Sequence, residues 1–183
     1  QIYTRGGDGG ETSLGNGRRI AKYATRIHAQ GDIDETNAVI GLARQHTAAR
    51  SDIDDILARV QNDLFDLGAD LTTPGNDPSD GSLRIQPSQT ERLEREIDQL
   101  NENLKPLNSF ILRGGTELAA ALHFACTVCR RAERTSSALA AEENINIHSL
   151  KYINRLSDLL FVLARDANDR GASDILWKPG ENL

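Results

Sequence analysis

The sequence predicts an all-α fold, an antiparallel bundle of five helices preceded by a glycine-rich loop. Apolar residues recur at alternating steps of three and four along most of the chain, a spacing typical of amphipathic helices. Aromatic residues make up only 4 % of the chain, which disfavours a sandwich or barrel. Six of the 15 glycines fall within the first 17 residues, which leaves a glycine-poor body rich in Ala, Leu, Arg, Asp and Glu.

The glycine-rich N-terminal segment, residues 1–22, is called the head below. Helix is disfavoured there because each glycine costs roughly 1 kcal/mol relative to alanine. The head is either a flexible chain end or a phosphate-binding loop, since glycine lets backbone N–H groups approach an oxyanion closely. Hydroxyl and cationic side chains that suit a polyphosphate accompany the glycines: Thr4, Thr12, Ser13, Arg5 and Lys22. The head contains neither a Walker A motif nor a Rossmann fingerprint, so its spacing alone leaves both interpretations open.

The first two helices are predicted over residues 32–47 and 51–71. Asp32 and Glu35 form a capping-box pattern at the first start, and Ser51 begins a weaker pattern of the same kind. One apolar seam runs along the second helix, at Ile53, Leu57, Val60, Leu64, Leu67 and Leu71. Residues 72–87 contain three prolines and two glycines, so a loop is expected there.

Three further helices complete the expected bundle. The third begins at Ser88 and ends near Pro106, the fourth begins at Thr116 or Gly115, and the fifth covers residues 148–169. We expect one domain of 183 residues, made of the head (1–22), the helical bundle (23–170) and a tail (171–183) that docks through Trp177.

The formal charge of −6 and the pI near 5.2 make the chain a poor nonspecific binder of nucleic acid or membrane surfaces. No stretch approaches the 18 apolar residues of a membrane span, and no signal-peptide pattern is visible. Two cysteines argue against a disulfide scaffold and fit a reducing compartment, so we expect a cytoplasmic protein without nucleic-acid or membrane partners.

Two polar segments on the predicted helices could carry chemistry. In CRRAER, Arg130 and Arg134 share a face, and they either form a solvated surface with Glu133 or meet an anion. In YINRLSDLLF, Asn154 and Asp158 flank an apolar seam and either face solvent or meet a partner. Cys126 and Cys129 lie in mid-helix, where two small core residues are a better interpretation than a redox or zinc site.

Four ordered segments together resemble the PduO-type ATP:cob(I)alamin adenosyltransferases. They are the head IYTRGGDGGETSL…GRRIAK, then GDIDETNAVIGLAR, FILRGGTELAAALHFA…CRRAER and YINRLSDLLFVLAR. The resemblance implies a five-helix bundle that forms a homotrimer with active sites between subunits. It implies transfer of the 5′-deoxyadenosyl group of ATP to cob(I)alamin or cob(I)yrinic acid a,c-diamide, with release of triphosphate. A corrinoid reductase and an adenosylcobalamin-dependent enzyme are the partners it suggests.

The resemblance also assigns roles to residues. ATP with Mg²⁺ would be held by Thr4, Arg5, Gly6, Gly7, Thr12, Ser13, Lys22, Arg130, Glu133, Arg134 and Asn154, with no confident side-chain ligand to the metal. Arg130 and Asn154 would be catalytic, and Asp34, Phe110 and Asp158 would lie on the corrinoid side. Cob(I)alamin is itself the nucleophile, so the chain needs no serine or cysteine nucleophile, and positioning and electrostatics do most of the work.

The chain departs from the family pattern at two positions. Cys126 stands where an arginine that pairs with the acid matched by Asp34 is usual, and Arg113 stands where proline is usual. The first departure leaves a second hypothesis open, a nucleotide- and corrinoid-binding bundle with impaired turnover. A third hypothesis, a helical interaction protein, leaves the four matching segments unexplained.

Overall fold

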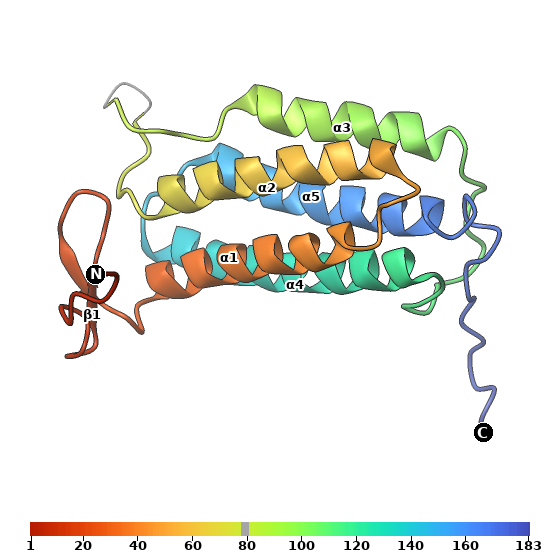
Figure 1. The fold of residues 1–183 in the computed structure, drawn as a ribbon, viewed down its shortest axis with the longest axis horizontal. Coiled ribbons are helices and arrows are strands. Elements are labelled where there is room, and N and C mark those ends of the chain that lie inside the picture. The colour runs from red at the N-terminus through yellow and green to blue at the C-terminus, as the bar shows by residue number, and fades with distance from the viewer. Residues whose placement is uncertain (78–80) are drawn as a thin grey trace.

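The computed structural model describes residues 1–77 and 81–183, and its described part is a bundle of five helices with a two-stranded hairpin in the head (Figure 1). The helices are α1 (Thr25–Arg44), α2 (Ser51–Leu71), α3 (Pro87–Asn101), α4 (Glu117–Glu142) and α5 (Ile147–Asp166). The strands are β1 (Glu11–Ser13) and β2 (Arg19–Ala21), which pair antiparallel. The predicted helical fold is confirmed, and the hairpin adds regular structure that the glycine content did not indicate.

Neighbouring helices are mostly antiparallel, as predicted. α1 packs against α2 and α4, α4 packs against α5, and the chain reverses direction between the members of each of these pairs (Figure 1). The pair α3 and α5 differs, because both helices run in the same direction (Figure 1). Their shared direction follows from the intervening α4, which returns the chain to the end at which α3 began.

The predicted apolar seams form the core. Ile53, Leu57 and Leu67 of α2 are completely buried, as are Leu122 of α4 and Leu160 of α5. Burial of each such side chain contributes about 1.5–3 kcal/mol, so these seams supply the main stabilisation of the bundle. No helix in the described part of the chain is long and apolar enough to cross a bilayer.

The start of the first helix was predicted wrongly. α1 begins at Thr25 rather than Asp32, because Asp32 accepts a hydrogen bond from Thr135 of α4 at 2.5 Å instead of capping a helix. Its companion Glu35 pairs with Arg131 of α4. The residues that resembled a capping box therefore join α1 to α4.

The start of α3 lies one residue earlier than predicted, and its end lies earlier as well. The backbone N–H of Gln86 donates to the side chain of Gln89, so these two residues form the capping box in place of Ser88. The helix ends at Asn101, ahead of Pro106. α4 begins as predicted, because the Thr116 hydroxyl accepts a hydrogen bond from the Ala119 N–H at 3.1 Å.

The C-terminal tail docks on the loop before α4, as the sequence led us to expect. The Trp177 N–H donates to the Phe110 carbonyl at 2.8 Å, and the Leu112 N–H donates to the Ile175 carbonyl at 2.7 Å. The Phe110 and Trp177 rings also contact each other, with centroids 5.9 Å apart. Two distant segments thereby form one surface at the end of the bundle where α4 begins.

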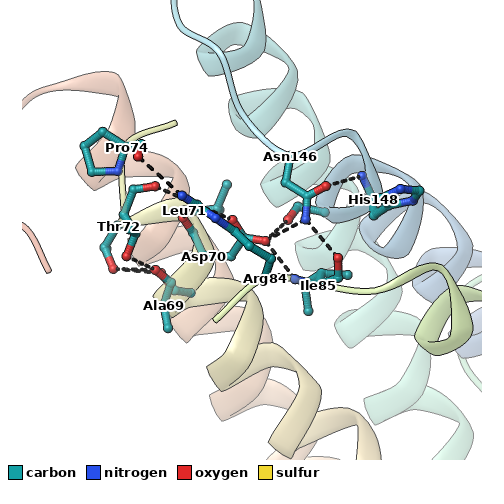
Figure 2. Close-up of polar contacts among 12 residues, drawn as sticks. Ala69, Asp70, Leu71, Thr72, Pro74, Arg84, Ile85, Asn146 and His148 are labelled. Carbon is teal, nitrogen blue, oxygen red and sulfur yellow. Dashed lines mark hydrogen bonds and ion pairs between the residues drawn. The ribbon is translucent and has the colours of Figure 1, made fainter. Parts of the chain in front are cut away.

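A buried ion pair organises the opposite end of the bundle (Figure 2). The Arg84 Nη1 lies 2.8 Å from the Asp70 Oδ1, and each side chain is only 2 % exposed. The other carboxylate oxygen accepts hydrogen bonds from the Ile85 N–H, the Asn146 amide and the Ser149 hydroxyl. The Asp70 carboxylate thus joins the end of α2 to the segment before α3 and to the start of α5.

The same end of α2 holds the head. Arg84 donates to the carbonyls of Thr73 and Pro74, at 2.8 and 3.3 Å (Figure 2). Arg26, buried at the start of α1, donates to the Leu71 carbonyl at 2.5 Å. The Thr72 carbonyl is then left to accept from the Gly15 N–H of the head at 3.2 Å. Cationic side chains at a helix C-terminus satisfy carbonyls that have no intrahelical partner and favour its negative dipole end.

Replacement of Asp70 by asparagine will test this network. Asp70→Asn removes the buried negative charge that pairs with Arg84 and accepts three further hydrogen bonds, so the free energy of unfolding should fall by about 3 kcal/mol. Urea denaturation measures the loss. Asp98→Asn, an exposed carboxylate on α3, makes the same change in net charge and should shift stability by less than about 0.5 kcal/mol. Equal small effects of the two substitutions would contradict a structural role for the ion pair.

Candidate active site

The hairpin gives the head a defined shape. Arg19, at the start of β2, donates to the Gly6 carbonyl at 2.7 Å and to the Ser13 hydroxyl at 3.2 Å. The Lys22 N–H donates to the Gly10 carbonyl at 2.9 Å. Residues 5–10 are therefore folded back over the hairpin. Arg19 was not among the predicted site residues, although the arginine pair in GRRIAK was a visible signal.

Gly7 and Lys22 are closely juxtaposed. A Cβ atom on Gly7 would lie only 2.8 Å from the Lys22 Nζ, so the ammonium group occupies the space that a side chain would fill. Thr4, Arg5 and Gly6 precede this point and are exposed, while Thr12 is half-buried on β1. The head thus places a cation against a glycine backbone, an arrangement suited to an oxyanion.

A second group of predicted residues lies on α4 and α5. The Asn154 amide donates to the Glu133 Oε1 at 2.8 Å, and Arg155 donates to the Asn154 Oδ1 at 2.9 Å. Arg155 also lies 3.8 Å from Asp158 and is paired with Glu94 of α3 at 2.8 Å. The Asn154 side chain is therefore held between the Glu133 carboxylate and the Arg155 guanidinium. Arg155 was not among the predicted site residues, yet it links Asn154 to Asp158.

Arg130 and Arg134 lie one turn apart on the exposed surface of α4. Arg134 donates to the Arg130 carbonyl at 3.3 Å, and neither guanidinium forms an ion pair within residues 1–77 and 81–183. The intrahelical pair between Arg130 and Glu133 that the sequence allowed is absent from this part of the chain, because Glu133 is engaged by Asn154. Two unpaired cations beside a fixed carboxamide leave this face of α4 suited to an anionic ligand.

The two cysteines are core residues. The Cys126 and Cys129 thiols are buried and donate to the Ser157 and Ile153 carbonyls of α5, at 3.3 and 3.4 Å. Burial raises the pKa of both thiols, so they remain protonated and unreactive at neutral pH. Within the described residues, no group of three or more His, Cys, Asp or Glu side chains could hold a metal ion. These buried contacts agree with the prediction that Cys126 and Cys129 are small core residues.

The three residues assigned to the corrinoid side occupy different places. Phe110 is 77 % exposed and lines a pocket of about 630 Å³ between the loop before α4 and the tail. Asp158 is exposed on α5, next to Arg155. Asp34 lies on α1, accepts a hydrogen bond from Gln30 at 2.5 Å, and lines a separate pocket with Phe65. One chain therefore does not gather Asp34 and Phe110 into a single pocket.

The head is also separate from the polar face of α4 and α5. It lies beyond the end of the bundle where α1 begins, while Phe110 precedes α4 at the opposite end (Figure 1). Among the described residues, the Gly15 N–H joins the head to the loop after α2 by donating to the Thr72 carbonyl. Across the residues that the structure describes, no hydrogen bond or ion pair joins the head to Arg130, Glu133, Arg134 or Asn154. The predicted nucleotide residues thus form two groups within one chain.

This architecture matches that of one class of enzyme, the PduO-type ATP:corrinoid adenosyltransferases. A variant of the enzyme from Lactobacillus reuteri, complexed with cobalamin and ATP, superposes with a TM-score of 0.91 and 38 % identity. The match covers 97 % of this chain and 99 % of that one. A family model described as cobalamin adenosyltransferase matches residues 2–167, and the chain belongs to this family.

Curated relatives agree with the family match. The corrinoid adenosyltransferase of Mycobacterium tuberculosis is 49 % identical over 183 residues, which cover 98 % of this chain and 94 % of the relative. The cobalamin adenosyltransferase of Cupriavidus metallidurans is 44 % identical, with coverage of 97 % and 94 %. The sequence resemblance to PduO-type enzymes is thereby confirmed.

The loop that carries Phe110 depends on Gly115, which a substitution can test. Gly115 has φ +112°, and a Cβ there would lie 2.0 Å from the Asn168 Oδ1. The same buried amide accepts from the Thr116 N–H and donates to the Gly114 carbonyl. Gly115→Ala should therefore lower the free energy of unfolding by about 2 kcal/mol or more, measured by urea denaturation.

Gly114→Ala is the matched control. A Cβ on Gly114 would make only an ordinary contact, 3.6 Å from the Ile175 Cδ1, and stability should change by less than about 1 kcal/mol. If the two substitutions changed the free energy of unfolding equally little, that result would contradict the close packing of Asn168 against this turn.

Proposed function

We propose that this protein transfers the 5′-deoxyadenosyl group of ATP to the cobalt of a reduced corrinoid. The observation that carries the proposal is the match of nearly the whole chain to a PduO-type enzyme complexed with cobalamin and ATP. In the reaction, the electron pair of cobalt(I) attacks C5′ of ATP and a cobalt–carbon bond forms. The C5′–O bond breaks, and triphosphate leaves with the bonding electrons. Such a displacement needs alignment of the two substrates and stabilisation of charge on the leaving group.

The nucleotide site is proposed to have two walls. The head supplies the first, with Lys22 and Arg5 as cations, the Gly6–Gly7 backbone as N–H donors, and Thr4, Thr12 and Ser13 as hydroxyls. Arg130, Arg134, Glu133 and Asn154 supply the second. Fixed cations aimed at the triphosphate stabilise the charge that develops as C5′–O breaks, which makes Arg130 and Asn154 the proposed catalytic groups. Mg²⁺ would enter bound to ATP.

The two walls are proposed to come from neighbouring subunits of a homotrimer. Within the described residues, no hydrogen bond or ion pair joins the head to Arg130 or Asn154, which supports this arrangement. A head-to-tail contact that closes after three copies would bring each head against the α4–α5 face of the next subunit. Asp34 and Phe110, which line different pockets of one chain, would meet the corrinoid together with Asp158 in the same way.

The product and its handling suggest further partners. A corrinoid reductase would supply cobalt(I), and an adenosylcobalamin-dependent enzyme would consume the product. The two unpaired thiols fit a reducing cytoplasm. Phe110, exposed beside Trp177, would pack against the lower face of the corrin and favour cobalt without its lower ligand.

A second candidate is a nucleotide- and corrinoid-binding bundle with slow turnover. One observation favours it, because the buried Cys126 offers no cation where related chains have an arginine. Anaerobic mixing with ATP, Mg²⁺ and cob(I)alamin, followed by absorbance, separates the two candidates. We expect the cob(I)alamin spectrum to disappear as adenosylcobalamin forms. ATP binding without conversion would favour the second candidate, and neither binding nor conversion would contradict both.

Gly7 offers a direct test of the head as an ATP site. In Gly7→Ala the new methyl group must displace the Lys22 ammonium, so the affinity for MgATP should fall by about tenfold, as for loss of a charge-assisted contact. Gly9→Ala is the control, because a Cβ there meets nothing within 4 Å. Isothermal titration calorimetry measures both, and equal affinities in the two variants would place the ATP phosphates away from Lys22.

A further inference from the structure

Arg113 lines the Phe110 pocket. This pocket, of about 630 Å³, is lined by Phe110, Phe161 and Trp177 together with Arg113. The guanidinium carbon lies 5.9 Å from the centroid of the Phe161 ring. The Arg113 Nη1 also lies 3.5 Å from the His123 Nδ1. Stacking on an aromatic face and a contact to a buried imidazole give this long side chain a defined position.

The charge of Arg113 has no counter-charge among residues 1–77 and 81–183. In the part of the chain that the structure describes, no carboxylate lies within ion-pair distance of its guanidinium. His123 cannot supply a negative charge, and burial and the nearby guanidinium lower its pKa and keep the ring neutral. Among the described residues, His123 is the one hydrogen-bond partner of the guanidinium, so most of its five N–H donors are available to a ligand.

An anion at the edge of a flat apolar ligand fits this pocket. Phe110 and Trp177 offer aromatic surface to a macrocycle, and Arg113 lies three positions after Phe110 on the same loop. A planar guanidinium pairs with a carboxylate through two parallel hydrogen bonds. A neutral amide oxygen also accepts a hydrogen bond, but it does not neutralise the positive charge of the guanidinium. The substituents at the macrocycle edge, rather than the distant nucleotide tail of a complete corrinoid, would lie closest to Arg113.

We infer that Arg113 is a specificity-determining residue that favours corrinoids with free carboxylates on the macrocycle edge, such as cob(I)yrinic acid a,c-diamide. The inference rests on the proposed function, since it assigns the Phe110 pocket to the corrinoid.

Three corrinoids separate the possible sources of the anion. In the cobalt(II) form, cobyrinic acid a,c-diamide carries edge carboxylates. Cobalamin carries edge amides and a tail phosphate, and cobinamide carries edge amides but neither free carboxylates nor a phosphate. Each is titrated into the MgATP-bound protein and followed by absorbance. Arg113→Gln should weaken binding of the diamide by about tenfold or more, with less than about a twofold change for cobinamide and cobalamin. Arg113→Lys, which keeps the charge, should recover part of the loss.

Arg95→Gln is the matched control, because Arg95 is exposed on α3 and forms no ion pair in the described residues. It should leave all three affinities unchanged. Equal weakening of the three corrinoids by Arg113→Gln would indicate a purely structural role and overturn the inference. Loss confined to cobalamin would assign Arg113 to the phosphate, and no loss at all would remove it from recognition; either result overturns the inference too.

Turnover of the unaltered protein separates this inference from the function on which it rests. Adenosylation of any of the three corrinoids supports the proposed function, whatever the effect of Arg113→Gln. If none is adenosylated, the proposed function fails even where the affinities differ.

Discussion

The buried ion pair between Asp70 and Arg84 fixes the end of the bundle from which the head extends. Two charges removed from water are costly, and their attraction offsets that cost only when the remaining donors and acceptors are satisfied. Here the second Asp70 oxygen accepts three hydrogen bonds, and Arg84 also binds the Thr73 and Pro74 carbonyls. The geometry of the loop after α2 follows from these contacts, and Gly15 of the head is hydrogen-bonded to that loop.

This anchoring has a direct consequence for chemistry. Because the head is held at the end of α2, its Lys22 ammonium does not contact Arg130 or Asn154 of its own chain. The Arg130 and Arg134 guanidiniums on α4 have no acidic partner in the described residues, although the chain as a whole carries a charge of −6. The head and the α4–α5 face each present cations suited to an anion, and we propose that a second copy of the chain unites them.

The helical architecture could be predicted from local patterns, because apolar seams and the Thr116 cap depend on residues close in sequence. The start of α1 could not, since Asp32 and Glu35 contact Thr135 and Arg131, about a hundred residues away. The burial of Arg84 could not be predicted either, because its partner Asp70 lies on the other side of the loop that follows α2.

Prediction of the site was limited in the same way, because its tertiary contacts join residues that are distant in sequence. The resemblance supplied the site residues, but spacing could not indicate that the Cys126 thiol is buried against α5 or that Arg155 orients Asn154. Nor could it separate the residues into two groups within one chain. That separation is a property of the tertiary structure, set by where the head leaves the bundle.

Mixing of two damaged proteins tests most directly whether each active site is shared between subunits. Lys22→Ala damages only the head, and Arg130→Ala damages only the α4–α5 face, so each protein alone should be inactive. When the two are unfolded together and refolded as an equal mixture, random assembly should restore about a quarter of the unaltered activity, because one site in four combines two intact walls. Mixed oligomers that form, as seen by native mass spectrometry, but remain inactive would contradict a site shared between subunits.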